Sequence, residues 1–382
     1  MSTRQLIYLD YAAATPVDER VAAAMRPYFG EKFYNPSATY LAAKGVAEDL
    51  AAARGGVAHV IGARPSEIVF TAGGTEANNL AIQGVMRHFP NANIVVSAVE
   101  HESVLAPAGL FNCKAAPVDK TGTVDVARIA ELIDDNTVLV SIMYANNEVG
   151  TIQPIREIAQ MVGQKRADRP QITDRRPLYF HTDAAQAANY LDLHASRLGV
   201  DLMTLNGGKI YGPKQSGALF MRAGIELEPL ILGGGQERGY RSGTENVAAA
   251  IGFAAALEQA QGMRREEAER LQKLQAYFFE QLKKKLPRAT IDGSHKKRLP
   301  NNVHVTFPGV DNERLLMQLD EAGIVAAAGS ACSASGEEPS HVLRAMGVSR
   351  AGAQASLRFT MGRGTTEADI RRTIDMLARL AG

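Results

Sequence analysis

Short apolar runs alternate with helix-like segments through the first two thirds of the chain. The runs include "EIVFTA", "NIVVSAV", "TVLVSIMYAN" and "LYFHTDAAQ", and two of the segments that follow are "TEANNLAIQGVMRHF" and "IREIAQMVGQK". The runs are apolar at successive positions, which is typical of strands buried on both faces. The repeated strand–helix order predicts an α/β domain with a mostly parallel sheet covered by helices.

The pattern changes near residue 245. A long helical stretch over about residues 246–286, with a candidate break near "QGM", leads into "NNVHVTF", "DNERLLMQLDEAG", "SLRFTMG" and "TEADIRRTIDMLARLA". These mixed segments predict a smaller α+β domain. We expect a large domain over residues 15–260 and a small domain built from residues 1–14 and 261–382.

Composition and charge exclude several classes of function. With 46% hydrophobic and 22% charged residues among 382, the chain is predicted to be globular with a substantial core. Lys and Arg (42) balance Asp and Glu (41), so no net field favours direct binding of nucleic acid. The opening "MSTRQLIYLDYAAATP" has an Asp inside its apolar stretch and no targeting pattern. The longest near-apolar run, residues 247–257, is shorter than the roughly 20 residues that span a membrane.

The two cysteines point to a reducing, cytoplasmic location. Cys113 and Cys332 are too few for a disulfide framework and fit no zinc spacing, so we expect no metal site. Cys113, in "GLFNCKAAPV", has the setting of an ordinary strand or core cysteine. Cys332, in "AAAGSACSASGEEPSHVL", has only small neighbours. That setting favours a reactive thiol on a mobile loop over a structural cysteine.

The stretch "TLNGGKIYGPKQSGALF" places Lys209 among glycines. It is not a nucleotide-binding P-loop, because Pro213 stands where that motif needs its lysine. Small residues beside Lys209 permit close packing around its amine. Desolvation would then favour the neutral, nucleophilic amine that Schiff-base lysines require.

Three further candidates have a structural alternative each. In "TAGGTEANN", Gly74 and Thr75 open a helix after a strand, which makes an anion site or simply a well-capped turn. Asp183, at the end of the run "YFHTD", faces the crevice where α/β proteins bind ligands, or it caps the next helix. Arg358, between two apolar residues of a predicted strand, grips a substrate carboxylate or makes a structural ion pair. Together with Lys209 and Cys332, these are the parts of a pyridoxal-phosphate enzyme that acts on a sulfur-containing amino acid.

Nearly end to end, the sequence resembles the cysteine desulfurases of the class V aminotransferase superfamily. The resemblance is carried, in order, by "IYLDYAAATP", "NPS", "GGTEANNLAI", "EHESVL", "NNEVGTIQP", "FHTDAAQ", "GGKIYGPK", "GGGQERGYRSGTENV", "GSACSAS", "EPSHVLRAMG" and "LRFTMGR". It implies fold type I of the pyridoxal-phosphate enzymes: a mostly parallel seven-stranded sheet flanked by helices, plus a smaller α+β domain. It also implies conversion of L-cysteine to L-alanine, with sulfur passing through a cysteine persulfide to an iron–sulfur scaffold or a tRNA-thiolation enzyme.

The resemblance assigns cofactor contacts position by position. Lys209 would bind pyridoxal 5'-phosphate (PLP) as an imine, Asp183 would pair with its pyridinium nitrogen, and His101 would stack on its ring and assist proton transfers. The remaining cofactor contacts would come from Asn147 and Gln186 at the ring oxygen, from Gly74 and Thr75 at the phosphate, and from Thr244 at the phosphate of a neighbouring subunit. The last contact implies a homodimer.

Substrate contacts and two departures complete the comparison with the family. Arg358 would bind the substrate carboxylate with Asn35 close by, and Cys332 would take the sulfur. The family's phosphate-binding Ser and His are Asn206 and Gly208 here, and Tyr40 replaces a common His. We expect backbone N–H groups, Asn206 or Arg241 to compensate at the phosphate. A selenocysteine lyase, an aminotransferase and a non-catalytic sulfur-transfer scaffold stay open as alternatives.

Overall fold

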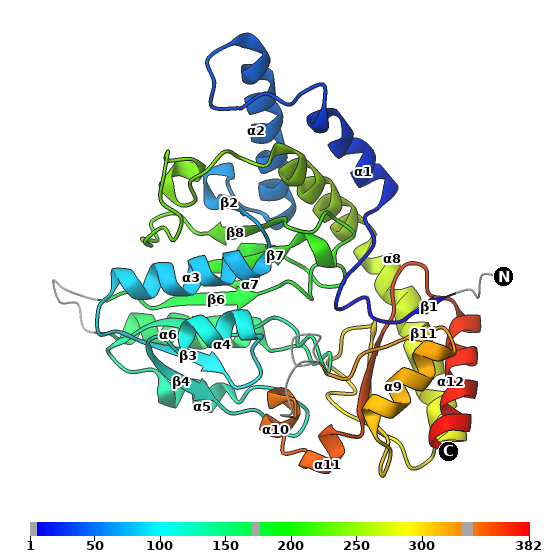
Figure 1. The fold of residues 1–382 in the computed structure, drawn as a ribbon. Coiled ribbons are helices and arrows are strands. Elements are labelled where there is room, and N and C mark those ends of the chain that lie inside the picture. The colour runs from blue at the N-terminus through cyan, green and yellow to red at the C-terminus, as the bar shows by residue number, and fades with distance from the viewer. Residues whose placement is uncertain (1–5, 170–175, 330–338) are drawn as a thin grey trace.

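The computed structural model describes residues 6–169, 176–329 and 339–382, and a seven-stranded sheet dominates it (Figure 1). The strand order is β2-β8-β7-β6-β5-β3-β4. Only β8 runs antiparallel to its neighbours, and the other pairs are parallel. The predicted mostly parallel sheet is therefore confirmed. Its strands are β2 Ile68–Thr71, β3 Asn93–Ser97, β4 Asn112–Ala116, β5 Thr137–Ser141, β6 Tyr179–Asp183, β7 Leu202–Asn206 and β8 Gly217–Met221.

Helices cover both faces of this sheet. Successive residues of one strand face different cores: Phe70 of β2 packs with α2 and α8, whereas Val69 packs with α3 and α4. This two-sided burial explains why strands such as β8 (GALFM) carry apolar residues at successive positions. The helices around the sheet are α1 Glu19–Met25, α2 Leu41–Ile61, α3 Gly74–His88, α4 Glu102–Ala108, α5 Val126–Leu132, α6 Ile155–Asp168 and α7 Ala195–Leu198. Short 3-10 turns are η1 Arg26–Phe29, η2 Pro65–Glu67, η3 Gly207–Lys209 and η4 Glu237–Gly239.

A smaller α+β unit packs beside the carboxyl ends of the main strands. Its antiparallel sheet has the order β12-β10-β9, and the N-terminal β1 pairs in parallel with β11. The C-terminal helix buries Ile370, Ile374 and Leu377, whose spacing of four and three residues keeps them on one helical face. The elements are β1 Ile7–Tyr8, β9 Thr290–Ile291, β10 Asn302–Thr306, β11 Ile324–Val325, β12 Ser356–Thr360, α9 Asn312–Glu321, α10 His341–Ala345, α11 Arg350–Ala353 and α12 Glu367–Ala381.

Helix α8, Val247–Lys285, joins the two units without a break (Figure 1). Its first part packs into the core of the large sheet through Phe253, and its second part packs into the small core through Phe278. The interruption considered near "QGM" is therefore absent from this helix. The predicted domain boundary at residue 260 stays a prediction. Within the described ranges, no helix combines the length and apolar character needed to cross a lipid bilayer.

The strand directions gather the candidate residues at one edge. Because β2 and β7 both run antiparallel to β8, β2 points the same way as the parallel strands. Residues that follow β2, β3, β5, β6 and β7 thus meet at one edge of the sheet. Cys113 lies elsewhere, on the edge strand β4, where its side chain is exposed. The expected strand position is confirmed, but a core position is wrong.

Candidate active site

A cavity of about 300 Å³ lies at this edge. Nine of the residues singled out from the sequence line it, although they span positions 74 to 358. They are Gly74, Thr75, His101, Asn147, Asp183, Gln186, Asn206, Lys209 and Arg358.

Lys209 lies in the 3-10 turn η3 after β7, and its side chain contacts the N-terminal segment. Its Nζ donates a hydrogen bond to the carbonyl of Ala13, and Gln186 Nε2 donates to the carbonyl of Ala12 at 3.0 Å. Residue 207 must be small, because a Cβ there would collide with the Ser216 hydroxyl. Gly207, two residues before Lys209, therefore serves close packing. Residues 12–13 form one wall of the cavity.

Asp183 ends β6 and is 7% exposed. Its Oδ1 accepts a hydrogen bond from the Ala185 backbone at 2.9 Å, and its Oδ2 accepts one from Asn78 Nδ2 at 2.8 Å. The backbone contact resembles a cap, but the residues after Asp183 form turns and no helix. Its carboxylate is held between a strand end and helix α3, and it lines the cavity.

His101 follows β3 and is the N-cap of α4. Its Nδ1 accepts a hydrogen bond from the Ser103 backbone N–H at 3.1 Å and lies 2.8 Å from Ser103 Oγ. Capping the helix with its side chain fixes the ring against the first turn of α4. The imidazole therefore lines the cavity on the same side as Asn78 and Ser103.

Helix α3 and Asn206 meet at one end of the cavity. Gly73 has a φ of 128°, a left-handed value that favours glycine, and it lets the chain turn from β2 into α3. Asn206 Oδ1 accepts from the Gly208 backbone at 3.0 Å, and a Cβ added at Gly74 would lie 3.2 Å from Asn206 Nδ2. A second cavity, of about 530 Å³, shares this end and is also lined by Lys214. The free N–H groups of the α3 terminus favour an anion here.

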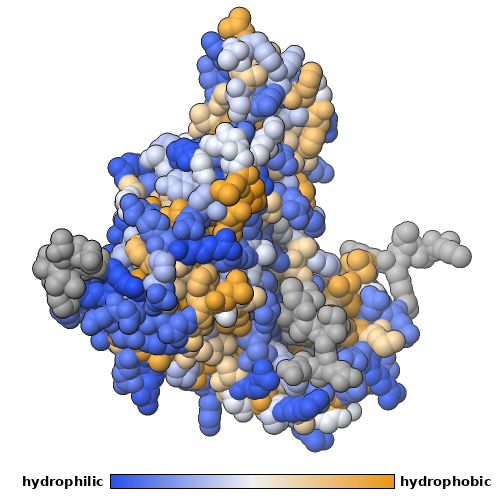
Figure 2. All heavy atoms as spheres, turned by 60° about the vertical axis from the view of Figure 1, so that its left-hand side comes forward, coloured by the Kyte–Doolittle hydropathy of each residue, from blue (hydrophilic) through white to orange (hydrophobic). Residues whose placement is uncertain are grey.

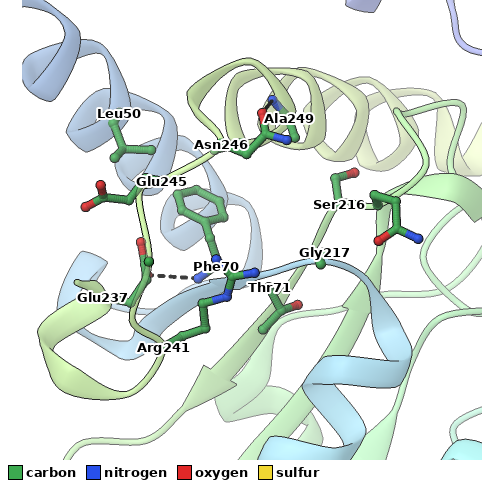
Figure 3. A pocket seen from close by; sticks show the side chains of 14 residues that line it. Leu50, Phe70, Thr71, Ser216, Gly217, Glu237, Arg241, Glu245, Asn246 and Ala249 are labelled. Atoms are coloured by element: carbon green, nitrogen blue, oxygen red, sulfur yellow. Dashed lines mark hydrogen bonds between the residues drawn. The ribbon is translucent and has the colours of Figure 1, made fainter. Parts of the chain in front are cut away.

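Arg241 belongs to a neighbouring cavity of about 200 Å³ (Figure 3). Its Nε lies 2.9 Å from Glu76 Oε1, in the first turn of α3. Glu237, in the same loop, accepts from the Phe70 backbone at 2.9 Å and pairs with Arg54 at 2.6 Å. Arg241 thus pairs with a carboxylate that lines the cavity of about 530 Å³ and does not itself line the cavity of about 300 Å³.

Arg358, on β12, is 2% exposed and already pairs with a carboxylate. Its Nη2 lies 2.7 Å from Asp10 Oδ1, and its Nη1 donates to the Asn147 carbonyl at 2.9 Å. The structural ion pair left open by the sequence is therefore present. The buried Nε has no hydrogen-bond partner among the described residues, so one donor stays available to a ligand.

Two sequence candidates do not line this cavity, and a third lies outside the described residues. Asn35 is exposed in the turn between α1 and α2, which Figure 1 shows at the far end of the large unit. Thr244 is exposed in the loop before α8 and does not line the cavity either. Cys332 lies outside the described residues. Asn35 does not line the cavity, and its expected place near Arg358 stays a prediction.

The sequence reasoning missed Asp10, Asn78 and Ser103. Asn78 lies four residues after Gly74, one helical turn along α3, so helical spacing was the available signal. Ser103 lies two residues after His101, at a usual distance for a capping contact. The Asp10–Arg358 pair joins positions 348 apart and left no local signal.

Comparison with known proteins gives this arrangement a family. The family model described as "Aminotransferase class-V" matches residues 7–373. The cysteine desulfurase IscS of Dictyoglomus turgidum is 42% identical over 98% of this chain and 94% of its own length. IscS 1 of Archaeoglobus fulgidus is 42% identical over 97% of this chain and 95% of its own.

Solved structures agree with the sequence relatives. A NifS-like protein of Rickettsia africae matches with a TM-score of 0.88 and 32% identity, over 98% of this chain and 99% of its own. A structure titled "NIFS-LIKE PROTEIN" matches with a TM-score of 0.90 and 33% identity, at 98% and 99% coverage. SspA, solved in complex with cysteine, matches with a TM-score of 0.79 and 33% identity, at 93% and 98% coverage. The chain therefore belongs to the aminotransferase class-V family and, within it, to the cysteine desulfurases.

Proposed function

We propose that this chain is a PLP-dependent cysteine desulfurase that converts L-cysteine to L-alanine and passes the sulfur to Cys332. One observation carries the proposal: a single cavity gathers an amine, a buried carboxylate, an imidazole and a buried guanidinium. In the proposed reaction, the Cys332 thiolate forms a bond to the substrate sulfur as the C–S bond breaks. The electron pair of that bond stays on the carbon, which takes up a proton to give alanine.

The donor set of the cavity fits PLP. Lys209 supplies the amine for an imine, the Asp183 carboxylate suits a protonated ring nitrogen, and the start of α3 with Asn206 suits a phosphate. His101, Asn147 and Gln186 line the space between them. PLP, when bound, supplies an electron sink for the charge that develops on the substrate carbons.

Arg358 supports binding of the substrate carboxylate. Its unpartnered Nε is buried at the cavity, where leaving a donor unsatisfied costs about 1–3 kcal/mol. A carboxylate oxygen would satisfy it, while Asp10 and the Asn147 carbonyl hold the rest of the guanidinium in place. This division fixes the direction of the remaining donor. Asn35 joins this site in our proposal only if it comes from a second copy of the chain.

Chain connectivity supports a role for Cys332 at the same site. Ala327 forms a β-bridge with Arg358, with hydrogen bonds of 2.7 and 3.1 Å between their backbones. Cys332 follows Ala327 by five positions, and five residues reach at most about 18 Å. The chain segment that leads to Cys332 is therefore anchored at Ala327, beside Arg358.

We further propose a cytoplasmic homodimer that delivers sulfur to an acceptor protein, either an iron–sulfur scaffold or a tRNA-thiolation enzyme. Large apolar side chains are exposed toward the end formed by α1 and α2 (Figure 2), a pattern that marks interaction surfaces. They include Phe29, Phe33, Tyr40 and Leu41, which are 52–83% exposed. Thr244 is exposed as well, as a contact to a partner's phosphate requires.

The test is incubation of the purified protein with PLP and L-cysteine. We expect alanine, sulfide and a persulfide on Cys332 by mass spectrometry. Cys332→Ala should keep its PLP absorbance and lose the persulfide. Continued full sulfide release from that variant would indicate a selenocysteine lyase or aminotransferase instead, and protein that takes up no PLP would indicate a non-catalytic scaffold.

A further inference from the structure

Two side chains, Asn78 and Ser103, connect His101 to Asp183 through hydrogen bonds. Asn78 Nδ2 lies 2.8 Å from Asp183 Oδ2 and 2.8 Å from Ser103 Oγ. Ser103 Oγ lies 2.8 Å from His101 Nδ1. Asn78 is 1% exposed and Ser103 is 8% exposed, so water does not compete for these contacts. The chain of contacts links the residue expected at the ring nitrogen of the cofactor, Asp183, with the residue expected to stack on its ring, His101.

The Asn78 amide has only one favourable orientation in this chain. A carboxylate oxygen accepts hydrogen bonds and cannot donate, so the atom of Asn78 that faces Asp183 must be the nitrogen. The opposite orientation would bring two acceptor oxygens to 2.8 Å. The same nitrogen also faces Ser103, and its second hydrogen therefore goes to Ser103 Oγ. This orientation leaves the buried Asn78 Oδ1 without a hydrogen-bond partner among the described residues.

The orientation of the Asn78 amide also fixes the direction of the hydrogen bond between Ser103 and His101. Because its oxygen accepts from Asn78, the hydroxyl proton remains for the neighbouring nitrogen, His101 Nδ1. The Ser103 backbone N–H donates to the same nitrogen at 3.1 Å. Two donors therefore converge on His101 Nδ1, and a proton on that nitrogen would face both of them.

We propose that Asn78 and Ser103 are positioning residues that hold neutral His101 as the tautomer with its proton on Nε2. His101 then donates a hydrogen bond through Nε2 to a group bound in the cavity. Nε2 has no partner among the described residues. The lone pair of His101 Nδ1 accepts the hydrogen bonds from Ser103, so it is not available as a base for a group in the cavity. The consequence for the reaction rests on the proposed function, whereas the tautomer itself depends only on residues of this chain.

The test uses nitrogen NMR of histidine-labelled full-length protein, without PLP and again with PLP bound. His101→Gln identifies the His101 signals. We expect an unprotonated Nδ1 and a protonated Nε2 in both forms. Ser103→Ala removes one buried neutral hydrogen bond and should shift the tautomer ratio toward Nδ1–H by roughly fivefold. Ser103→Thr keeps a hydroxyl and should restore the wild-type ratio.

Two further variants sharpen the test. Ser196 pairs with His194 Nδ1 at 3.1 Å with the same two-residue spacing, but on the surface, so Ser196→Ala is a matched control that should leave the His101 signals unchanged. Asn78→Asp would share one proton with Asp183 across the 2.8 Å contact, so its oxygen that faces Ser103 accepts instead of donating. This draws the Ser103 proton away from His101 and should raise the Nδ1–H form further.

Protonated Nδ1 in the wild-type protein, or a ratio unmoved by both Ser103→Ala and Asn78→Asp, would overturn the proposal. Failure of the proposed function is distinguishable. It would leave the Nε2–H tautomer in place in a protein that takes up no PLP or releases no alanine.

Discussion

The buried carboxyl group of Glu100, beside the candidate site, allows the effect of burial on a pKa to be measured. Glu100 precedes His101 and is fully buried. Its Oε1 accepts hydrogen bonds from Ser97 Oγ at 2.5 Å and from the Met143 backbone at 2.8 Å, while its Oε2 has no described partner. Burial raises the pKa of Glu100 to about 8, the nearby Asp183 carboxylate adds to the rise, and the two hydrogen bonds oppose it.

The raised pKa makes stability depend on pH in a defined direction. In the unfolded chain the carboxyl loses its proton near its ordinary pKa of 4.5, whereas the folded protein keeps the proton up to about pH 8. The unfolded state thus binds fewer protons in this window, so the free energy of unfolding falls by about 1.4 kcal/mol per pH unit as pH rises. From pH 5.5 to pH 8 the expected loss from Glu100 is about 3 kcal/mol.

Glu100→Gln should remove this loss. The amide keeps the shape of the protonated acid and still accepts from Ser97 and Met143, so stability at pH 5.5 should change little. At pH 8.5 the variant should be more stable than the wild type by about 3 kcal/mol. Urea unfolding at both pH values measures the difference, and Glu131→Gln, at an exposed position, is the matched control. Parallel pH profiles for wild type and Glu100→Gln would refute the reasoning.

Three other changes test the remaining parts of the site. Arg358→Lys should raise the KM for L-cysteine at least tenfold, since one ammonium cannot hold Asp10 and a substrate carboxylate at once; an unchanged KM contradicts the substrate role. Gly208→His should fold normally, because a Cβ there comes no nearer than 3.6 Å to another residue, and should tighten PLP binding about tenfold by adding a charged donor; fluorescence titration with PLP measures this, and weaker binding contradicts it. Glu237→Gln leaves Arg54 with an uncompensated buried charge and should lower the free energy of unfolding by about 3–5 kcal/mol, which thermal melts would test.

The sequence predicted the parts of the fold that depend on local pattern. Strands such as β5 (TVLVS) and β8 (GALFM) carry apolar residues at successive positions because helices cover both faces, and that pattern is visible in a single run of residues. Gly74, Asp183 and Lys209 were found because each ends or follows such a strand, and parallel strands bring their carboxyl ends together. His101, Asn147 and Gln186 came from the family resemblance instead. Topology then assembles a site that no single motif specifies.

Features that depend on distant partners were not predictable. The ion pair of Arg358 was left open because its partner, Asp10, lies on the first described segment of the chain. Cys113 was expected in a strand or core from its neighbours, but β4 is the last strand of its sheet, and strand order is not written in local sequence. Helix α8 has no break because two separate cores hold its two halves, which outweighs its internal glycines, Gly252 and Gly262.

The altered residues before Lys209 have a physical rationale in this structure. Where the family commonly has a serine and a histidine, Asn206 and Gly208 act on each other: the asparagine oxygen accepts the glycine N–H, which fixes the amide and leaves Nδ2 beside the start of α3. One side chain thus orders the turn and keeps a donor at the proposed phosphate end. The space that a histidine would occupy is bordered by the stem of Lys214, 3.7 Å from a Cβ at position 208. Lys214, which lines the cavity of about 530 Å³, therefore brings a cationic side chain close to position 208 from six residues further along the chain.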